Sequence, residues 1–275
     1  MSFRIETASI RYPNGQCALS QLTLAGGRGE RIAVIGPSGA GKTTLLRLLA
    51  TALRPSEGRV ELLEQSPWAL SAGRLRRLRC TIGMVHQAPP MPPRQRVVTA
   101  ILAGRLGVWP AWKSMLSLAY PADLAGATEQ LARLDLADRL FDRCDQLSGG
   151  QLQRVGVARV LYQRPELILA DEPVSAMDPV LANLTLGELC KEAATRTATL
   201  VASLHAVDLA LRWFPRIVGL RSGAIAFDLP AERVTDVLLR ELYASESESP
   251  PVHGREPLRM AALSAGGDRP KSACR

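Results

Sequence analysis

The chain has 275 residues, of which 47% are hydrophobic and 22% charged, so it can bury a full core as one large domain with an insertion or as two domains. No segment has the roughly 18 uninterrupted apolar residues of a membrane-spanning helix, because arginines break the apolar runs near 97–109 and 155–170. The first residues lack a basic region followed by an apolar one, so we expect no signal peptide.

The formal net charge of +8 is concentrated in one internal window. Residues 65–122 contain no Asp or Glu but eight Lys and Arg residues, which leaves 26 basic against 26 acidic residues in the rest of the chain. A uniformly basic nucleic-acid-binding protein would spread its charge differently. We therefore expect no nucleic-acid partner, although a local basic patch remains compatible with one.

The N-terminal part predicts strands and then a helix. Residues 3–12 (FRIETASIRY) alternate in polarity, and residues 18–36 predict a strand, a Gly-rich turn and the buried strand RIAVIG. The loop PSGAGK follows. The leucines of residues 43–53 (TTLLRLLATAL) then recur at helical spacing, and this helix stops before Pro55.

The remainder predicts a parallel sheet with an insertion. A basic helix (72–80) precedes the buried run TIGMVHQ (81–87), and strands return with ELILADEP (166–173), TATLVASLH (197–205) and RIVGLRSG (216–223). Residues at about 88–155 instead predict a Pro-rich loop and helices. Alternating strands and helices indicate parallel strands with crossover helices, interrupted by a helical insertion. The Ser-, Pro-, Gly- and Arg-rich tail at 246–275 is expected to be disordered.

The segment GPSGAGKT (36–43) fits the phosphate-loop pattern GxxxxGK[ST], between a strand and a helix. Glycines let successive backbone N–H groups turn toward a phosphate, and the helix N-terminus adds positive potential. Lys42 is expected to reach the β- and γ-phosphates, and the Thr43 hydroxyl to bind Mg²⁺. The alternative is a Gly-rich turn with an unrelated lysine. The residues expected to bind the ATP phosphates are Gly36, Pro37, Ser38, Gly39, Ala40, Gly41, Lys42, Thr43 and Thr44.

The segment ELILADEP predicts a buried strand with two carboxylates at its C-terminal end. Asp171 is expected to belong to the Mg²⁺ shell. Glu172 is expected to orient and polarise the water that attacks the γ-phosphate. An Asp–Glu pair is usually solvated, but a preceding buried strand in a chain with a phosphate loop favours catalysis.

The stretch LSGGQLQR (147–154) strongly resembles the signature of ABC transporter ATP-binding subunits. The signature begins shortly before the carboxylate-bearing strand, as is usual in that family. Further segments resemble other family motifs in the same order along the chain. They are Tyr12 for the aromatic that stacks on adenine, Gln87 for the glutamine between core and helical subdomain, SAMD (175–178) for the dimer-contact loop, and His205 for the switch histidine.

This resemblance covers residues 1–245 and implies an α/β fold. The expected architecture is a P-loop NTPase (RecA-like) core with an N-terminal antiparallel β subdomain and an α-helical subdomain inserted at about 88–155. The resemblance also implies a head-to-tail homodimer, in which the signature faces the nucleotide of the other protomer. The implied roles are catalysis for Glu172, His205, Lys42 and Gln87, Mg²⁺ binding for Thr43, Gln87 and Asp171, and nucleotide contacts for Tyr12, Ser148, Gly149, Gly150, Gln151 and Asp178.

Three less specific stretches are similar to the ATPases of phosphonate importers and related phosphite and phosphate systems. They are residues 100–123, 204–223 and 239–246. The similarity implies a subunit at the cytoplasmic face of the inner membrane that serves integral membrane permease subunits. A periplasmic phosphonate-type binding protein would belong to the same system, and ATP hydrolysis would drive uptake of the phosphorus compound.

Two alternatives share the catalytic motifs. One is the ATPase of another ABC importer or of an exporter. The other is a soluble ABC ATPase of DNA repair or the ribosome, which is disfavoured because such proteins generally carry long coiled-coil insertions or two cassettes. The role of Trp109 and Trp112 also stays open at this point, between contact with a permease, flanked by the cations of 94–113, and packing within the helical subdomain.

Overall fold

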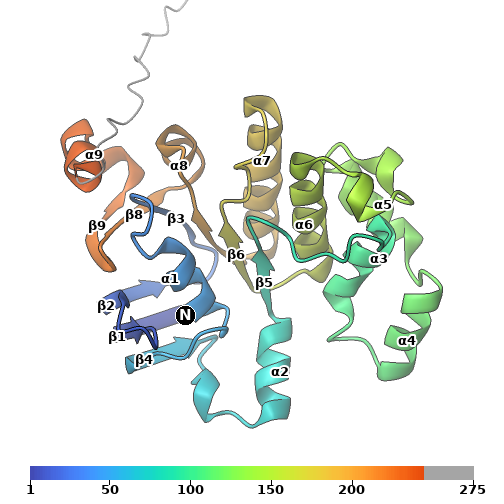
Figure 1. Cartoon of the computed structure of the whole chain (residues 1–275), viewed down its shortest axis with the longest axis horizontal. Helices are drawn as coiled ribbons and strands as arrows, with labels where there is room; N and C mark the ends of the chain where they lie inside the picture. Colours follow the sequence, from blue (N-terminus) through green and yellow to red (C-terminus); the bar gives the residue numbers. More distant parts are fainter. Residues whose placement is uncertain (245–275) are drawn as a thin grey trace, which may run out of the picture.

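The computed structural model describes residues 1–244, without the side chains at 118 and 119, and the predicted tail at 246–275 lies outside this range (Figure 1). Two β-sheets organise the described residues. The first is antiparallel, in the order β2 (Cys17–Gly26), β1 (Phe3–Arg11) and β4 (Glu57–Leu62). The second has the order β5 (Ile82–Val85), β6 (Leu167–Asp171), β7 (Thr199–Ser203), β3 (Arg31–Ile35), β8 (Arg216–Arg221) and β9 (Ala224–Pro230).

The second sheet is parallel except where β9 returns antiparallel to β8 at one edge. Its neighbouring strands β5, β6, β7 and β3 end nearly level, with Asp171 opposite Ser203 and Val34 also paired with Ser203. The loops after these strands therefore emerge together at the C-terminal ends of the strands. A parallel α/β sheet usually binds its ligands at these ends.

Helices connect the strands on both faces of this sheet (Figure 1). In chain order they are α1 (Lys42–Leu49), α2 (Ala72–Cys80), α3 (Val97–Leu102), α4 (Ala111–Ala119), α5 (Leu124–Ala132), α6 (Gly149–Gln163), α7 (Pro179–Arg196), α8 (Val207–Trp213) and α9 (Asp236–Tyr243). The helices α3 to α6 all lie between β5 and β6 in sequence, and α3, α4 and α5 form the green group beside the sheet in Figure 1. No helix of the described range is both long and apolar enough to cross a membrane.

Alternating side chains of the central strands enter two separate hydrophobic cores. Ile32 and Val34 of β3 pack with α1 and the antiparallel sheet, whereas Ala33 and Ile35 pack with the helices of the other face. This alternation follows from the two-residue period of a strand. Both faces of the strand are covered, which explains the continuous apolar run in the sequence.

An ion-pair cluster joins the helical segment to α7. Arg133, directly after α5, donates from Nε to Glu188 Oε2 at 2.6 Å and from Nη1 to Glu192 Oε2 at 2.9 Å. The pKa of Arg133 is raised: burial lowers it, but the hydrogen bonds to the two glutamates outweigh that effect. The cluster therefore holds the end of α5 against α7 by directional, charge-assisted hydrogen bonds.

The two tryptophans of the α4 region have different environments. Trp109 is half-buried, packs edge-on against the ring of Tyr162 with centroids 6.4 Å apart, and has the Lys113 ammonium 4.8 Å from its ring centroid. Trp112 is 69% exposed. Other exposed apolar side chains near Trp112 in sequence are Val108, Met115, Leu116 and Tyr120. Trp109 thus belongs to local packing, whereas Trp112 belongs to an exposed apolar face, which we define as Val108, Trp112, Met115, Leu116 and Tyr120.

This difference predicts unequal losses of stability for two matched substitutions. Trp109→Ala should lower the free energy of unfolding by about 2–3 kcal/mol, because it removes a packed aromatic side chain. Trp112→Ala should change it by less than about 0.5 kcal/mol, because an exposed side chain loses little burial. Chemical denaturation of both variants measures the difference, and equal losses would contradict the assignment.

Candidate nucleotide-binding site

The phosphate loop connects β3 to α1 and depends on glycines in the left-handed backbone region. Gly36 has φ 149°, and a β-carbon there would collide with the carbonyl oxygen of Leu220. Gly41 has φ 104°, and its β-carbon would lie 2.7 Å from the carbonyl oxygen of Ala18. Gly41 also caps α1 without a side-chain hydrogen bond, so no side chain covers the first N–H groups of that helix. Exposed N–H groups at a helix start suit an anionic phosphate.

Lys42 lies over this loop. Its Nζ donates to the carbonyl oxygens of Gly36 at 2.6 Å and Pro37 at 2.9 Å. The side chain is 6% exposed, so the ammonium is held beside the loop rather than in solvent. This geometry puts a positive charge beside the phosphate loop.

Asp171 joins the end of β6 to the phosphate loop. Its Oδ1 accepts a hydrogen bond from Thr43 Oγ1 at 3.1 Å and another from Ser203 Oγ at 2.7 Å. Thr43 belongs to the first turn of α1, and Ser203 is the last residue of β7. Three segments that are distant in sequence therefore meet at one carboxylate.

Glu172 is the centre of a second polar cluster. Its Oε2 accepts from Gln87 Nε2 at 2.7 Å, and its Oε1 lies 2.7 Å from His205 Nε2. The backbone of Glu172 has φ 47°, a left-handed conformation that residues with a β-carbon seldom adopt. Its N–H bonds both the carbonyl and the hydroxyl oxygen of Ser203, at 3.2 and 3.0 Å, which fixes this conformation.

A cavity of about 400 Å³ lies beside these groups and brings together most of the predicted residues. Tyr12 lines it, with its hydroxyl 3.3 Å from Thr44 Oγ1. The whole lining is Tyr12, Gln16, Cys17, Ala18, Ser38, Gly39, Ala40, Gly41, Lys42, Thr43, Thr44, Glu172, His205, Ser222 and Gly223. Gly36, Pro37, Gln87 and Asp171 are not part of this lining but are hydrogen-bonded to residues that are.

The signature residues lie elsewhere. Ser148 caps α6 and exchanges hydrogen bonds with Gln151, from Ser148 N to Gln151 Oε1 at 2.9 Å and from Gln151 N to Ser148 Oγ at 3.3 Å. Gly150 adjoins the dimer-contact loop predicted at 175–178, because a β-carbon on it would lie 2.6 Å from the carbonyl oxygen of Ala176. Ser148, Gly149 and Asp178 are exposed, and Asp178 caps α7. These residues form a separate surface that does not line the cavity.

Two residues of this region were not among the predicted site residues. Ser203 is the buried partner of Asp171, and Gln153 is a buried amide. Gln153 Nε2 donates to the carbonyl oxygens of Gln87 at 2.9 Å and Glu172 at 3.1 Å. Ser203 could have been found from its place at the end of a predicted parallel strand. Gln153 lies within the stretch LSGGQLQR, but no sequence pattern distinguishes it there as a site residue.

The donor set around Asp171 fits a hard divalent cation. A carboxylate oxygen and the Thr43 hydroxyl oxygen lie within hydrogen-bond distance of each other, beside a loop built for phosphate. Mg²⁺ is typically held by one or two carboxylates together with substrate phosphates rather than by a protein cage. Residues 1–244 accordingly need no cluster of three acidic, His or Cys ligands, and none occurs among them.

His86 precedes Gln87 at the end of β5. Loss of hydration lowers the pKa of His86, and the nearby Asp171 carboxylate acts in the opposite direction. The cations Arg159 and Arg47 lower the pKa further. A neutral imidazole beside this edge is therefore favoured.

Comparison with known proteins decides the family. Residues 19–175 match the ABC transporter family. The chain belongs to this family. The expectation of an ABC transporter ATP-binding subunit, drawn from LSGGQ and its accompanying motifs, is confirmed.

Among relatives of this ABC transporter subunit, the Phosphonates import ATP-binding protein PhnC 1 of Cupriavidus necator is 81% identical over 100% of both chains. A protein of the same name from Pseudomonas aeruginosa is 66% identical, with 90% of this chain and 92% of that protein covered. The resemblance to phosphonate-importer ATPases is confirmed by these relatives.

Solved structures confirm the predicted fold class. MJ0796, described as a bacterial ABC transporter cassette in a dimeric structure, superposes with a TM-score of 0.72 at 26% identity, with 83% of this chain and 98% of that chain covered. The ADP conformation of the cassette MJ1267 superposes with a TM-score of 0.73 at 23% identity, with 89% of this chain and 99% of that chain covered. The α/β core with its antiparallel sheet is thus the fold of ABC ATPases.

Proposed function

We propose that the chain is the ATP-binding subunit of an ABC importer, in which ATP hydrolysis drives uptake of phosphonate or a related phosphorus oxyanion through a separate membrane permease. The observation that carries this proposal is the full-length similarity to the phosphonate-import protein of Cupriavidus necator. The site supports it, because the phosphate loop contacts Asp171 through Thr43, and both Gln87 and His205 contact the neighbouring Glu172.

In this proposal the ATP phosphates occupy the loop of residues 36–44. Its N–H groups and the Lys42 ammonium neutralise phosphate oxygens, and the Tyr12 ring, which also lines the cavity, stacks on adenine. Thr43, Asp171 and Gln87 would hold Mg²⁺, which when bound would offset negative charge on the phosphates. Gln87 would contact the cation through its amide oxygen while Nε2 keeps its hydrogen bond to Glu172.

Glu172 orients the attacking water and accepts its proton. The carboxylate is held by hydrogen bonds from two sides, so it needs little reorganisation as charge develops. Gln87 and His205 act as positioning groups for it. The buried Gln153 amide fixes the backbone of both Gln87 and Glu172, which keeps the two segments in register.

In this proposal one chain holds half of each complete site, which the exposure of Ser148 and Gly149 supports. Ser148, Gly149, Gly150 and Gln151 would contact the γ-phosphate bound by a second copy arranged head-to-tail, with Asp178 at the same interface. Small residues at the start of α6 expose N–H groups to an anion. The solved MJ0796 structures that superpose on this chain are themselves described as dimeric.

The proposed ABC ATPase domain is 1–245, with a helical subdomain at about 88–155. We place the subunit peripherally at the cytoplasmic face of the inner membrane, where permease subunits and, across the membrane, a periplasmic phosphonate-type binding protein complete the importer. Nucleic acid is not a partner in this proposal. The exposed apolar face of α4 would contact the permease, because large apolar side chains at the surface favour an interface.

Replacing Glu172, which is proposed to orient the attacking water, tests its role in hydrolysis. Glu172→Gln should retain ATP binding, lower the rate of phosphate release by at least about 100-fold, and favour an ATP-bound dimer, because the amide cannot accept the proton. Phosphate release and size-exclusion chromatography measure these changes. Glu129→Gln, at an exposed position of α5, is the control and should behave like the unchanged chain. Near-normal hydrolysis by Glu172→Gln would disprove the role.

Growth on a phosphonate tests the cargo. In a bacterium that lacks its own phosphonate-importer ATPase but keeps the permease and binding protein, the chain should restore growth on methylphosphonate as sole phosphorus source. The Glu172→Gln variant should not restore growth, because import needs hydrolysis. If the active chain fails to restore growth while it binds the permease, another transported compound is indicated.

The α4 face can be tested separately from folding. Trp112→Ala should reduce the amount of permease that co-purifies with the chain and leave its ATP hydrolysis in isolation unchanged, because Trp112 is exposed and does not line the nucleotide cavity. Val237→Ala is the control, since Val237 is a 62% exposed apolar residue on α9. Equal permease recovery for both variants would exclude this face as the contact.

A further inference from the structure

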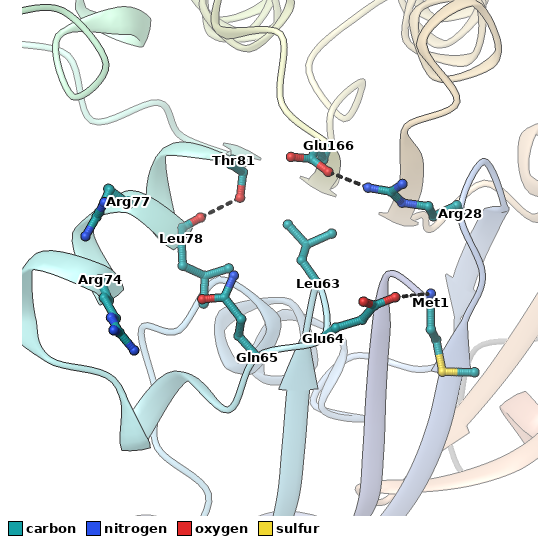
Figure 2. Close-up of a pocket in the computed structure, with 10 residues that line it drawn as sticks. All are labelled: Met1, Arg28, Leu63, Glu64, Gln65, Arg74, Arg77, Leu78, Thr81 and Glu166. Atoms are coloured by element: carbon teal, nitrogen blue, oxygen red, sulfur yellow. Dashed lines mark hydrogen bonds and ion pairs between the residues drawn. The ribbon is translucent and has the colours of Figure 1, made fainter.

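A second cavity, of about 550 Å³, lies at the opposite edge of the parallel sheet from the nucleotide site (Figure 2). Two of its lining residues show this position. Thr81 directly precedes β5, and Glu166 directly precedes β6, whereas Gln87 and Asp171 stand at the other ends of the same strands. None of the residues that line the nucleotide cavity lines this one.

The wall formed by α2 is basic. Arg74 and Arg77 lie one helical turn apart on this helix, and both line the cavity. Figure 2 shows them on one side, with Gln65 extending toward α2 from the segment after β4. On the other side are Arg28 and Glu166. Leu63 and Leu78 add apolar surface between these groups.

The acidic residues of the cavity are already neutralised. Glu166 Oε2 accepts from Arg28 Nη2 at 2.8 Å, and Glu64 Oε1 lies 3.4 Å from the amino group of Met1. Arg74 and Arg77, in contrast, form no ion pair with any acidic side chain of residues 1–244. The cavity therefore retains two uncompensated positive charges.

Helix α2 itself carries an unbalanced positive charge. Its nine residues include four arginines and no acidic residue, and Ser71 caps it without a side-chain hydrogen bond. Arg79 is used internally, since it donates to the hydroxyl and carbonyl oxygens of Thr51 at 2.8 and 3.1 Å. Like charges three residues apart destabilise a helix. An anion bound at Arg74 and Arg77 would remove part of this repulsion.

We propose that this cavity binds a small organophosphorus dianion, a phosphonate or phosphate monoester, between Arg74 and Arg77. Guanidinium groups match the oxygens of such anions in bidentate geometry. The Gln65 amide offers a neutral donor, and Leu63 and Leu78 offer contact for the organic substituent. The volume exceeds what an inorganic anion alone would fill. The site is distinct from the ATP site and goes beyond the proposed transport function.

Calorimetric titration of methylphosphonate into the full chain tests this site, with the nucleotide cavity saturated by ADP and Mg²⁺ so that the phosphate loop cannot contribute. We expect one saturable event and a rise in melting temperature. The double variant Arg74→Gln/Arg77→Gln should bind at least about tenfold more weakly, as expected when charge-assisted hydrogen bonds are lost.

Arg76→Gln is the matched control, because Arg76 is an exposed arginine of the same helix that does not line the cavity. It should keep the affinity of the unchanged chain. Arg74→Lys, which keeps the charge but loses the planar fork, should bind with intermediate affinity even if the double variant is unstable. Absence of saturable binding, or equal weakening in Arg76→Gln, would overturn the proposal.

A second arm separates a free ligand from a lipid headgroup. Co-sedimentation of the chain with phosphatidylglycerol vesicles is compared with that on phosphatidylcholine vesicles. We expect that substituting Arg74 and Arg77 does not change any excess binding to phosphatidylglycerol. Vesicle binding that requires both arginines, without binding of methylphosphonate, would overturn the small-ligand assignment. Unchanged ADP affinity in the variants shows that the nucleotide site is intact.

Discussion

The hydrogen bonds that meet at Asp171 connect the elements on which the whole site depends. Thr43 brings the phosphate loop and α1, Ser203 brings the end of β7, and Asp171 itself ends β6. The level register of these parallel strands makes the meeting possible, because it places their carboxyl ends side by side. A register shift of one residue would turn these polar side chains into one of the hydrophobic cores.

From this centre, two further connections extend to the helical segment. Gln153 of α6 holds the backbone of Gln87 and Glu172, and Arg133 after α5 holds Glu188 and Glu192 of α7. The connection through Gln153 lies at the C-terminal ends of β5 and β6, whereas the connection through Arg133 lies between helices. Because α6 begins at the signature, movement of this segment would carry Ser148 with it. In the proposed head-to-tail dimer, the fold would thus link the γ-phosphate region of one site to the signature surface that faces the other site.

The sequence predicts the parts of this fold whose local chemistry is distinctive. The buried strands, the phosphate loop and the paired carboxylates each have a pattern tied to one environment. β4 has no such pattern, because four of its six residues are charged or glycine and only Val60 and Leu62 are buried. Gln153 and the contrast between Trp109 and Trp112 depend on tertiary packing. A sequence pattern alone cannot distinguish the buried from the exposed member of two residues of the same type at neighbouring positions.

The cations of residues 65–122, the stretch without Asp or Glu, lie in separate parts of the folded chain. Arg74 and Arg77 line the cavity under α2, whereas the Arg105 guanidinium lies 5.8 Å from the centroid of the Tyr162 ring and Lys113 lies over Trp109. Figure 1 shows α2 and α4 in different parts of the molecule. An extended nucleic-acid track needs cations along a continuous surface. Cations used for packing around α4, and others gathered at a small cavity, instead favour two separate surfaces with different ligands.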